Sequence, residues 1–437
     1  MPVGEEKVDI MSAYGRLLFA VAVCLALTGC WSRTELNELG ITTATGMDLS
    51  HGEWIVTYQT IVPSAMSTGT GGASGANASQ TPVHVFSTKA KTMREAVALS
   101  DLENPRRLYF AHNNVLVIGR EAAEAGIGEI VDLYFRNPDA RETVMVLLAE
   151  NKASDVLKQF VPPERLPGTA MADILRKEER FASFFPAVSM YELAMSMNSD
   201  ARGAGVPEIV LKGEDEQLES LDIFKKTSTP SKLRLSRLGV FHGDRLVGWL
   251  GREESRGVSW LSDRVKGTTI SFECPGSGKP AKHSSFRVDR AKTRATPVKK
   301  GGHYAMEIEV KATGVLLEST CGQDLTKPDR MGEMEKQIED RIRRDMASGW
   351  QAVKKLGVDL PGFADKVHRR FPREWKRMKG RWESELAKLE LTYRVEATVR
   401  RTGLFQKSFD ELQREGERDY GGADRSGSGG TKGGGAR

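Results

Sequence analysis

The sequence predicts a mixed α/β fold (α+β in overall class) of three domains, in which mixed sheets are flanked by helices. Helical and strand patterns alternate over residues 82–160, strand patterns crowd together after residue 206, and a long amphipathic helix pattern begins near residue 331. The expected divisions are a signal peptide at 1–29, an N-terminal α/β domain at 30–200, a small strand-rich middle domain at 201–265, a C-terminal α/β domain with a long helix at 266–415, and a disordered tail at 416–437.

The N-terminal segment has the pattern of a lipoprotein signal peptide. Residues 17–27 are eleven consecutive apolar residues, which fits the core of an export signal and is too short to span a bilayer as a stable helix. The run ends in Leu27-Thr28-Gly29-Cys30, a lipobox whose small residues leave the backbone open around the thiol. We therefore expect cleavage before Cys30, lipidation of Cys30 and a mature chain outside the cytoplasm; a plain signal peptide or a buried helix with a chance cysteine is the alternative.

The residues before the apolar run carry a net charge of −1, although export signals favour a positive start. Initiation at Met11 would leave only Arg16 and the amino group as charges there. We therefore expect Met11 to be the physiological initiator, which leaves the mature chain unchanged.

The N-terminal domain is expected to open on a hairpin. Residues 40–49 and 53–62 alternate apolar and polar side chains around Ser50-His51-Gly52. The Gly- and Ser-rich segment 67–80 cannot bury apolar surface and is expected to be a mobile loop before a strand at 82–88.

An alternation of helices and strands then completes this domain. Thr92-Met93-Arg94-Glu95 is a capping-box pattern that predicts a helix to about Leu102. The elements expected after it are strands at Asn114–Ile118 and Thr143–Ala149 and helices at 120–135, Ala153–Phe160, 169–180 and 188–197.

The middle and C-terminal domains are expected to be rich in strands, up to one long helix. The expected elements are strands at 208–211, 221–225, 238–241, 245–249, 268–273, 285–297 and 303–318, and a helix at 251–262. A single apolar stripe follows on a helix of about 25 residues; it consists of Met331, Met334, Ile338, Ile342, Met346, Trp350 and Val353. Packing of the stripe on its own sheet is the favoured interpretation, and a partner- or membrane-binding face is the alternative.

Charge argues against a dedicated nucleic-acid binder. Removal of residues 1–29 takes away two basic and three acidic residues and raises the formal charge from +5 to +6, which is mild for this length. Residues 331–380 hold 13 Lys and Arg against eight Asp and Glu. We favour a solvated helical face there because the charges alternate in sign, with attraction to an anionic membrane surface as the alternative.

No catalytic or metal-binding set emerges from the sequence. The seven histidines are scattered, and neither HExxH nor CxxC nor GxSxG occurs. Gly276-Ser277-Gly278-Lys279 resembles a phosphate loop only faintly, because Glu273 replaces the first glycine and Pro280 replaces the hydroxyl residue. We therefore expect no enzyme, no metal and no cofactor. Cys274 and Cys321 are expected to be two buried free thiols, with a disulfide as the alternative.

Several short strings carry a resemblance that spans about Leu27 to Phe405. The strings are Gly29 to Ile41 (GCWSRTELNELGI), His112 to Gly119, Phe135 to Arg141 (FRNPDAR), Gly239-Val240-Phe241 with Leu246-Val247-Gly248, and Trp350, Gly357-Val358-Asp359, Gly362, Pro372, Trp375 and Trp382. In this order they resemble the Ger(x)C family, the lipoprotein C subunits of spore nutrient germinant receptors. The chain departs from the family in its Gly/Ser insert, its glycine-rich tail and Ser32, where the family usually has an acid.

The resemblance implies a three-domain lipoprotein anchored through Cys30 on the outer face of the spore inner membrane and assembled with the integral-membrane A and B subunits. Trp31, Arg33 and Glu35 follow the anchor, and we expect them at the lipid or subunit interface, since an aromatic ring suits the headgroup region; alternatively, Trp31 only caps the first domain. An extracytoplasmic solute-binding lipoprotein of a transporter and a cell-envelope hydrolase are the other classes considered. The first would need two similar lobes, and the second would need the catalytic set that is missing.

Overall fold

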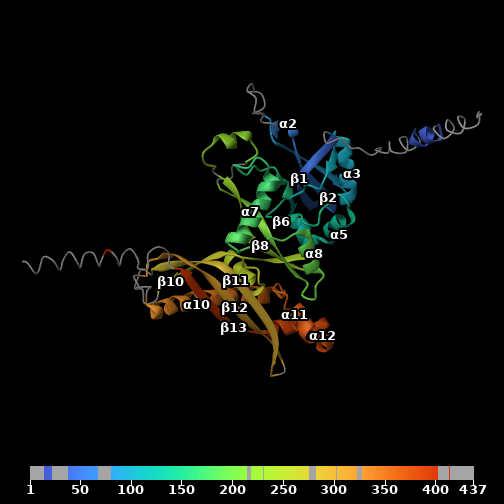
Figure 1. The fold of residues 1–437 in the computed structure, drawn as a ribbon. Helices are drawn as coiled ribbons and strands as arrows, with labels where there is room; N and C mark the ends of the chain where they lie inside the picture. The colour runs from blue at the N-terminus through green and yellow to red at the C-terminus, as the bar shows by residue number, and fades with distance from the viewer. Residues whose placement is uncertain are drawn as a thin grey trace, which may run out of the picture.

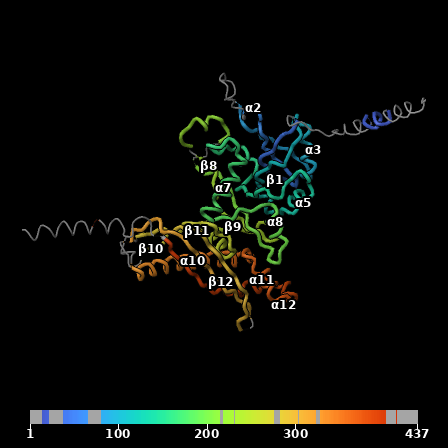
Figure 2. The backbone as a smooth tube through the Cα atoms, in the orientation of Figure 1, coloured from blue at the N-terminus to red at the C-terminus, as the bar shows by residue number. Residues whose placement is uncertain are grey.

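The structure is a computed structural model and describes residues 14–21, 38–66, 80–213, 218–229, 231–274, 282–301, 303–321, 327–401 and 413. Its strands form two sheets, one of nine strands and one of four. The nine-stranded sheet and its helices, drawn in blue to green, make one body, and the four-stranded sheet with the long helix α10, drawn in yellow to red, makes the other (Figure 1). The tube in Figure 2 shows the same division along the backbone.

The first body contains most of the elements expected before residue 250. They are β1 (Leu39–Ser50), β2 (Glu53–Ile61), α2 (Pro63–Met66), β3 (Val83–Ala90), α3 (Met93–Glu103), β4 (Arg107–Tyr109), β5 (Val115–Ile118), α4 (Arg120–Ala125), α5 (Gly128–Arg136), β6 (Met145–Ala149), α6 (Ala153–Leu157), α7 (Pro167–Phe181), α8 (Met190–Met197), β7 (Gly203–Gly213), η3 (Leu221–Lys225), β8 (Ser231–His242) and β9 (Arg245–Leu250). The expected hairpin at 40–62 and the strands near 82–88, 114–118 and 143–149 are confirmed.

The order of the large sheet is β3-β2-β1-β5-β6-β7-β8-β9, and β4 pairs with β1. Its centre is parallel from β1 through β5 and β6 to β7, and both flanks are antiparallel. The central strand β5 is buried on both faces: Val115 and Val117 belong to one apolar cluster, and Leu116 and Ile118 belong to another. Successive side chains of a strand point to opposite faces, so the apolar run at 115–118 serves both helical layers.

Three expectations in this body are wrong or only partly right. The helix expected at 120–135 is two helices, because Gly126 adopts φ +128 and ends α4. The strand expected at 221–225 is the 3-10 helix η3. At the start of α3, the Thr92 side chain accepts a hydrogen bond from the amide of Glu95, so half of the expected capping box is seen.

Strands of the expected middle domain continue the large sheet. β7 pairs in parallel with β6, and β8 and β9 extend the sheet from β7. The next helix, α9 (Arg252–Leu261), packs instead against α10 of the second body. The division into domains at 201 and 265 stays a prediction.

The second body is a four-stranded sheet covered by helices. Its elements are β10 (Thr268–Glu273), β11 (His283–Lys300), β12 (His303–Ser319), α10 (Pro328–Leu356), α11 (Phe363–Arg370), α12 (Pro372–Met378), η4 (Lys379–Arg381), α13 (Trp382–Lys388) and β13 (Glu390–Arg401). β13, which the sequence analysis missed, pairs in parallel with β12. The stripe of α10 is buried in the core of this body from Met334 to Val353, so packing on its own sheet is confirmed.

The cysteine expectation is wrong. Cys274, which follows β10, and Cys321, which follows β12, form a disulfide with their Cα atoms 5.1 Å apart. β10 and β12 both pair with β11, so their ends meet across one strand, a relation that residue spacing does not reveal.

Some expectations fall outside the described residues. These are the loop over 67–79, the phosphate-loop-like segment 276–279 and the tail at 416–437.

Candidate functional site

The expected site residues at the N-terminus, Cys30, Trp31, Arg33 and Glu35, lie outside the described residues. Within the segment expected to be a signal peptide, residues 14–21 are helical and exposed. None of the helices in the described ranges has both the length and the apolar character needed to cross a membrane. The anchor and its neighbours therefore stay predictions.

The matched residues near the C-terminal end do meet in the structure. Asp359 follows α10 and is buried, with 2% of its surface exposed. Its carboxylate accepts hydrogen bonds from the amides of Phe363 (2.9 Å) and Ala364 (2.6 Å) at the start of α11 and from Nε1 of Trp382 (3.1 Å). Burial raises the pKa of Asp359 to about 6, against the effect of these three donors. One carboxylate thus fixes the ends of three helices.

A second carboxylate comes from the first body. Asp200, in the turn between α8 and β7, accepts a hydrogen bond from Nε1 of Trp375 (3.2 Å) and contacts Nδ1 of His368. Lys379 lies 3.8 Å away. The ring of His368 stacks on Trp375, and Trp375 meets Trp382 edge-on.

These side chains form one cluster between the two bodies, which we call the aspartate clasp. It consists of Asp200, Asp359, His368, Trp375 and Trp382. Arg202 and Asp359 form a β-bridge, and a Cβ atom on Gly203 would lie 2.6 Å from the carbonyl oxygen of Asp359. Only glycine permits this approach, so the start of β7 and the turn after α10 are in direct contact.

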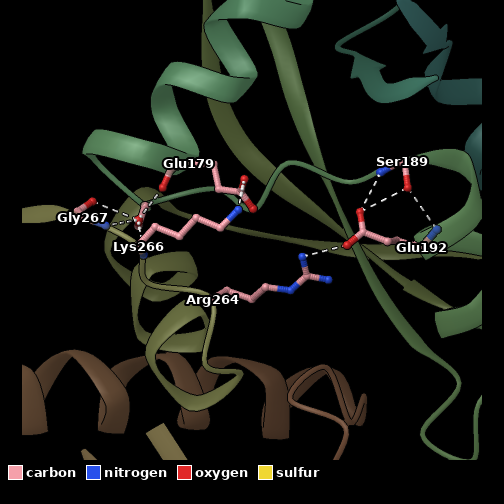
Figure 3. A network of polar contacts seen from close by, with 7 residues as sticks. Glu179, Ser189, Glu192, Arg264, Lys266 and Gly267 are labelled. Carbon is pink, nitrogen blue, oxygen red and sulfur yellow. Dashed lines mark hydrogen bonds and ion pairs between the residues drawn. The ribbon is translucent and has the colours of Figure 1, made fainter. Parts of the chain in front are cut away.

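A second junction joins α7 and α8 to the segment before β10 (Figure 3). Arg264 pairs with Glu192 at 3.0 Å, and Lys266 pairs with Glu179 at 2.6 Å. Glu192 also accepts from the amide and hydroxyl of Ser189, which caps α8. The hydroxyl of Ser183, next to the Lys266–Glu179 pair, donates to the carbonyl of Gly267 (2.9 Å).

Beside this junction lies a buried carboxylate. One oxygen of Glu178 accepts from the amides of Phe184 (2.6 Å) and Phe185 (3.0 Å), and its other oxygen has no partner among the described residues. Burial raises the pKa of Glu178 to about 7, and the nearby charge of Glu179 acts in the same direction.

The other matched segments build the large sheet or line its surface. His112 to Gly119 contains β5, and Asn113 in it donates to Thr45 (2.8 Å) and Tyr134 (3.0 Å). Phe135 to Arg141 ends α5 beside a groove of about 510 Å³ between α3 and α5. Most charged side chains that line the groove already have a partner in the protein: Arg136 pairs with Asp132 at 2.7 Å, and Glu129 accepts a hydrogen bond from Nε1 of Trp54.

Indoles and backbone amides only donate, and the clasp carboxylates accept from them, so the two carboxylates tie the helix ends together. Within the described ranges, no three His, Cys, Asp or Glu side chains gather as metal ligands. The matched motif in the sequence identified Asp359, Trp375 and Trp382 but not Asp200. Asp200 follows a helix and contacts an indole far along the chain, and no local sequence pattern predicts such a contact.

Two family models match the chain in order. Residues 32–211 match the model described as "Spore germination protein N-terminal domain", and residues 236–403 match "Spore germination B3/ GerAC like, C-terminal". The clasp joins the two matched regions, since Asp200 lies in the first and the other four residues lie in the second.

Curated relatives match over nearly their whole length. "Spore germination protein KC" of Bacillus subtilis (strain 168) is 26% identical over 397 residues, which cover 89% of this chain and 96% of the relative. "Spore germination protein B3" of the same strain is 21% identical, over 85% of this chain and 93% of the relative. The crystal structure of the GerBC protein matches with a TM-score of 0.50 at 15% identity, over 82% of this chain and 96% of that one, and shows the same fold.

Proposed function

The chain belongs to the Ger(x)C family of spore germination proteins, and we propose that it is the lipid-anchored C subunit of a spore nutrient germinant receptor. The strongest support is that the two family models cover residues 32–211 and 236–403 in order. The chain also spans 96% of a relative named as a spore germination protein.

The anchor in this proposal is a lipid on Cys30. Its support is the lipobox Leu27-Thr28-Gly29-Cys30 after an apolar run too short to span a bilayer. β1 begins at Leu39, nine residues after Cys30, so the folded body lies within about 30 Å of the lipid. Two or more acyl chains hold a protein stably on a membrane, whereas one chain does so only marginally. Trp31, Arg33 and Glu35 in this short segment then face the headgroups or the partner subunits.

The role proposed is assembly with the integral-membrane A and B subunits on the outer face of the spore inner membrane, without catalysis. The clasp and the second junction support this role, since the polar groups of both form hydrogen bonds and ion pairs between the two bodies. A solute-binding lipoprotein is disfavoured, because its two lobes are alike, whereas this chain joins a nine-stranded sheet to a four-stranded one.

The test is deletion of the gene in its spore-forming host, with complementation by the wild type and by Cys30→Ala. Deletion is expected to abolish germination by one nutrient and to lower the amount of the A and B subunits in the spore membrane. Growth, sporulation and germination by non-nutrient triggers stay normal. Cys30→Ala is expected to accumulate as precursor or to leave the membrane fraction and to fail in complementation. Normal nutrient germination in the deletion strain would contradict the receptor role, and normal cleavage with unchanged detergent partitioning of Cys30→Ala would contradict the anchor.

A further inference from the structure

The helices after the clasp carry a concentrated positive charge. Residues 369–381 contain seven Lys and Arg and one acid, Glu374. All seven cations are exposed; they are Arg369, Arg370, Arg373, Lys376, Arg377, Lys379 and Arg381, and we call them the basic surface.

The fold turns these cations outward. α12 buries Trp375 and Met378. At 100° per residue, Arg373, Lys376 and Arg377 lie together on the opposite face of that helix. The packing of α12 on the clasp therefore presents three cations side by side to solvent.

Little in the described part of the chain neutralises them. Lys379 lies 3.8 Å from Asp200, and it is the one member with a carboxylate partner there. Arg369 donates to the main-chain carbonyl of Asp365. Glu374 is paired with Lys299 at 2.6 Å and accepts from the hydroxyl of Tyr304, so a cation outside the basic surface shares its charge.

α10 shows the contrast. Of its seven basic residues, Arg330, Arg341 and Arg343 each pair with an acid three or four positions away on the same helix. The alternating, solvated face that the sequence suggested for 331–380 therefore describes α10, whereas α11 and α12 carry like charges that lack counter-charges. An unpaired group of like charges on one face is electrostatically unfavourable and attracts a surface of the opposite sign.

We propose that the basic surface binds the anionic phospholipid headgroups of the membrane in which the chain is anchored; this rests on the lipid anchor of the proposed function. Each Lys or Arg near an anionic membrane adds to the attraction, and the guanidinium fork matches a phosphate. The anchor keeps that membrane within reach at high effective concentration, an advantage that a diffusing acidic protein lacks.

The position of the surface adds a geometric reason. β1, which follows the anchor, lies with α3 at one end of the molecule, and α11 and α12 lie at the other end (Figure 1). A lipid at one end and headgroup contacts at the other would hold the molecule along the membrane at two points, where a lipid alone would let it pivot.

The test uses the whole mature chain with Cys30→Ser, which carries no lipid. Its co-sedimentation is measured with vesicles of phosphatidylcholine, with and without phosphatidylglycerol, at low salt. We expect binding only to the anionic vesicles, lost at about 0.5 M ionic strength, where charges are screened beyond a few Å. The variant Arg373→Gln/Lys376→Gln/Arg377→Gln is expected to bind about 100-fold more weakly at unchanged melting temperature.

The matched control is Lys212→Gln/Lys232→Gln/Arg234→Gln, which removes the same charge from exposed positions of β7 and β8 in the first body. It is expected to bind like the parent. Equal binding to neutral and anionic vesicles, or full binding by the Arg373 triple variant, would overturn the proposal. A third outcome would also overturn it: the parent does not bind vesicles but captures the detergent-solubilised A and B subunits, and the Arg373 triple variant loses that capture. The basic surface would then be a binding site for protein. The anchor is judged separately, from the detergent partitioning of the unmutated protein.

Discussion

Nε1 of Trp375 donates a hydrogen bond to Oδ1 of Asp200 over 3.2 Å, although the two residues are 175 positions apart in the chain. The same carboxylate contacts His368, and the neighbouring Trp382 is bound by Asp359. The turn between α8 and β7 and the C-terminal helices thus share one polar cluster. This cluster joins the two bodies beside an apolar core to which both contribute residues.

Asp200→Ala is expected to destabilise the protein by about 2–3 kcal/mol, because it leaves the indole of Trp375 and the ring of His368 without their acceptor in a partly buried cluster. The measurement is urea unfolding followed by tryptophan fluorescence. Asp222→Ala is the control, since Asp222 is an exposed acid whose carboxylate pairs with Lys225 and Ser220, both close in sequence. Equal effects of the two substitutions would show that the clasp does not hold the bodies together.

The sequence was sufficient for elements whose signal is local. The stripe from Met334 to Val353 has the period of a helix, and the structure buries it in one core. The apolar run at Asn114–Ile118 predicted a strand, and the structure has β5 at Val115–Ile118.

Pairings between distant segments could not be predicted. β13 was missed although the apolar residues of 391–399 alternate with polar ones as in a half-buried strand; its parallel pairing with β12 is the part that no local pattern signals. The disulfide was missed because Cys274 and Cys321 meet only through β11, which lies between their strands. The acceptor role of Asp200 was missed in the same way, so the matched motif gave three of the five clasp residues.

Glu178→Gln is expected to change how stability depends on pH. The pKa of Glu178 is raised to about 7 by burial, so between about pH 4.5 and 7 the folded protein holds a proton that the unfolded chain releases. Through this group, wild-type stability falls as the pH rises across that window and stays low above it. Gln keeps the acceptor for Phe184 and Phe185 and has no charge to bury, so the variant should gain at most about 3 kcal/mol over the wild type at pH 8 and nothing at pH 4.

Unfolding free energies measured across this pH range give the test. Asp173→Asn, which alters the pair with Arg176 on the same helix, is the control and should keep the wild-type slope between pH 4.5 and 7. Parallel pH profiles of Glu178→Gln and the wild type would contradict the assignment.

The disulfide between Cys274 and Cys321 closes a loop with a sequence separation of 47. Loop-closure entropy in the unfolded chain then makes it worth about 4 kcal/mol, so reduction, or Cys274→Ser with Cys321→Ser, should lower the urea midpoint by a corresponding amount. Thiol titration of the unreduced, denatured Cys30→Ser mature chain checks the bond directly, with no free thiol expected. Two titratable thiols would show that the cysteines are unpaired.

Gly203→Ala tests how closely the two bodies meet. The added Cβ would lie 2.6 Å from the carbonyl oxygen of Asp359 and 2.9 Å from its carbonyl carbon, and backbone atoms cannot move aside as a flexible side chain can. We expect a loss of about 1–3 kcal/mol from overpacking. Gly332→Ala is the matched control, because a Cβ on Gly332 in α10 meets nothing within 4 Å and should stabilise the helix by up to about 1 kcal/mol.

The two substitutions should therefore move the melting temperature in opposite directions. The loss from Gly203→Ala should also be smaller in an Asp200→Ala background, because a clasp already opened at Asp200 leaves β7 freer to shift away from Asp359. Full additivity of the two losses would mean that the contact at Gly203 and the hydrogen bonds of Asp200 hold the bodies independently, and a neutral Gly203→Ala would mean that the turn after α10 is free to move from β7.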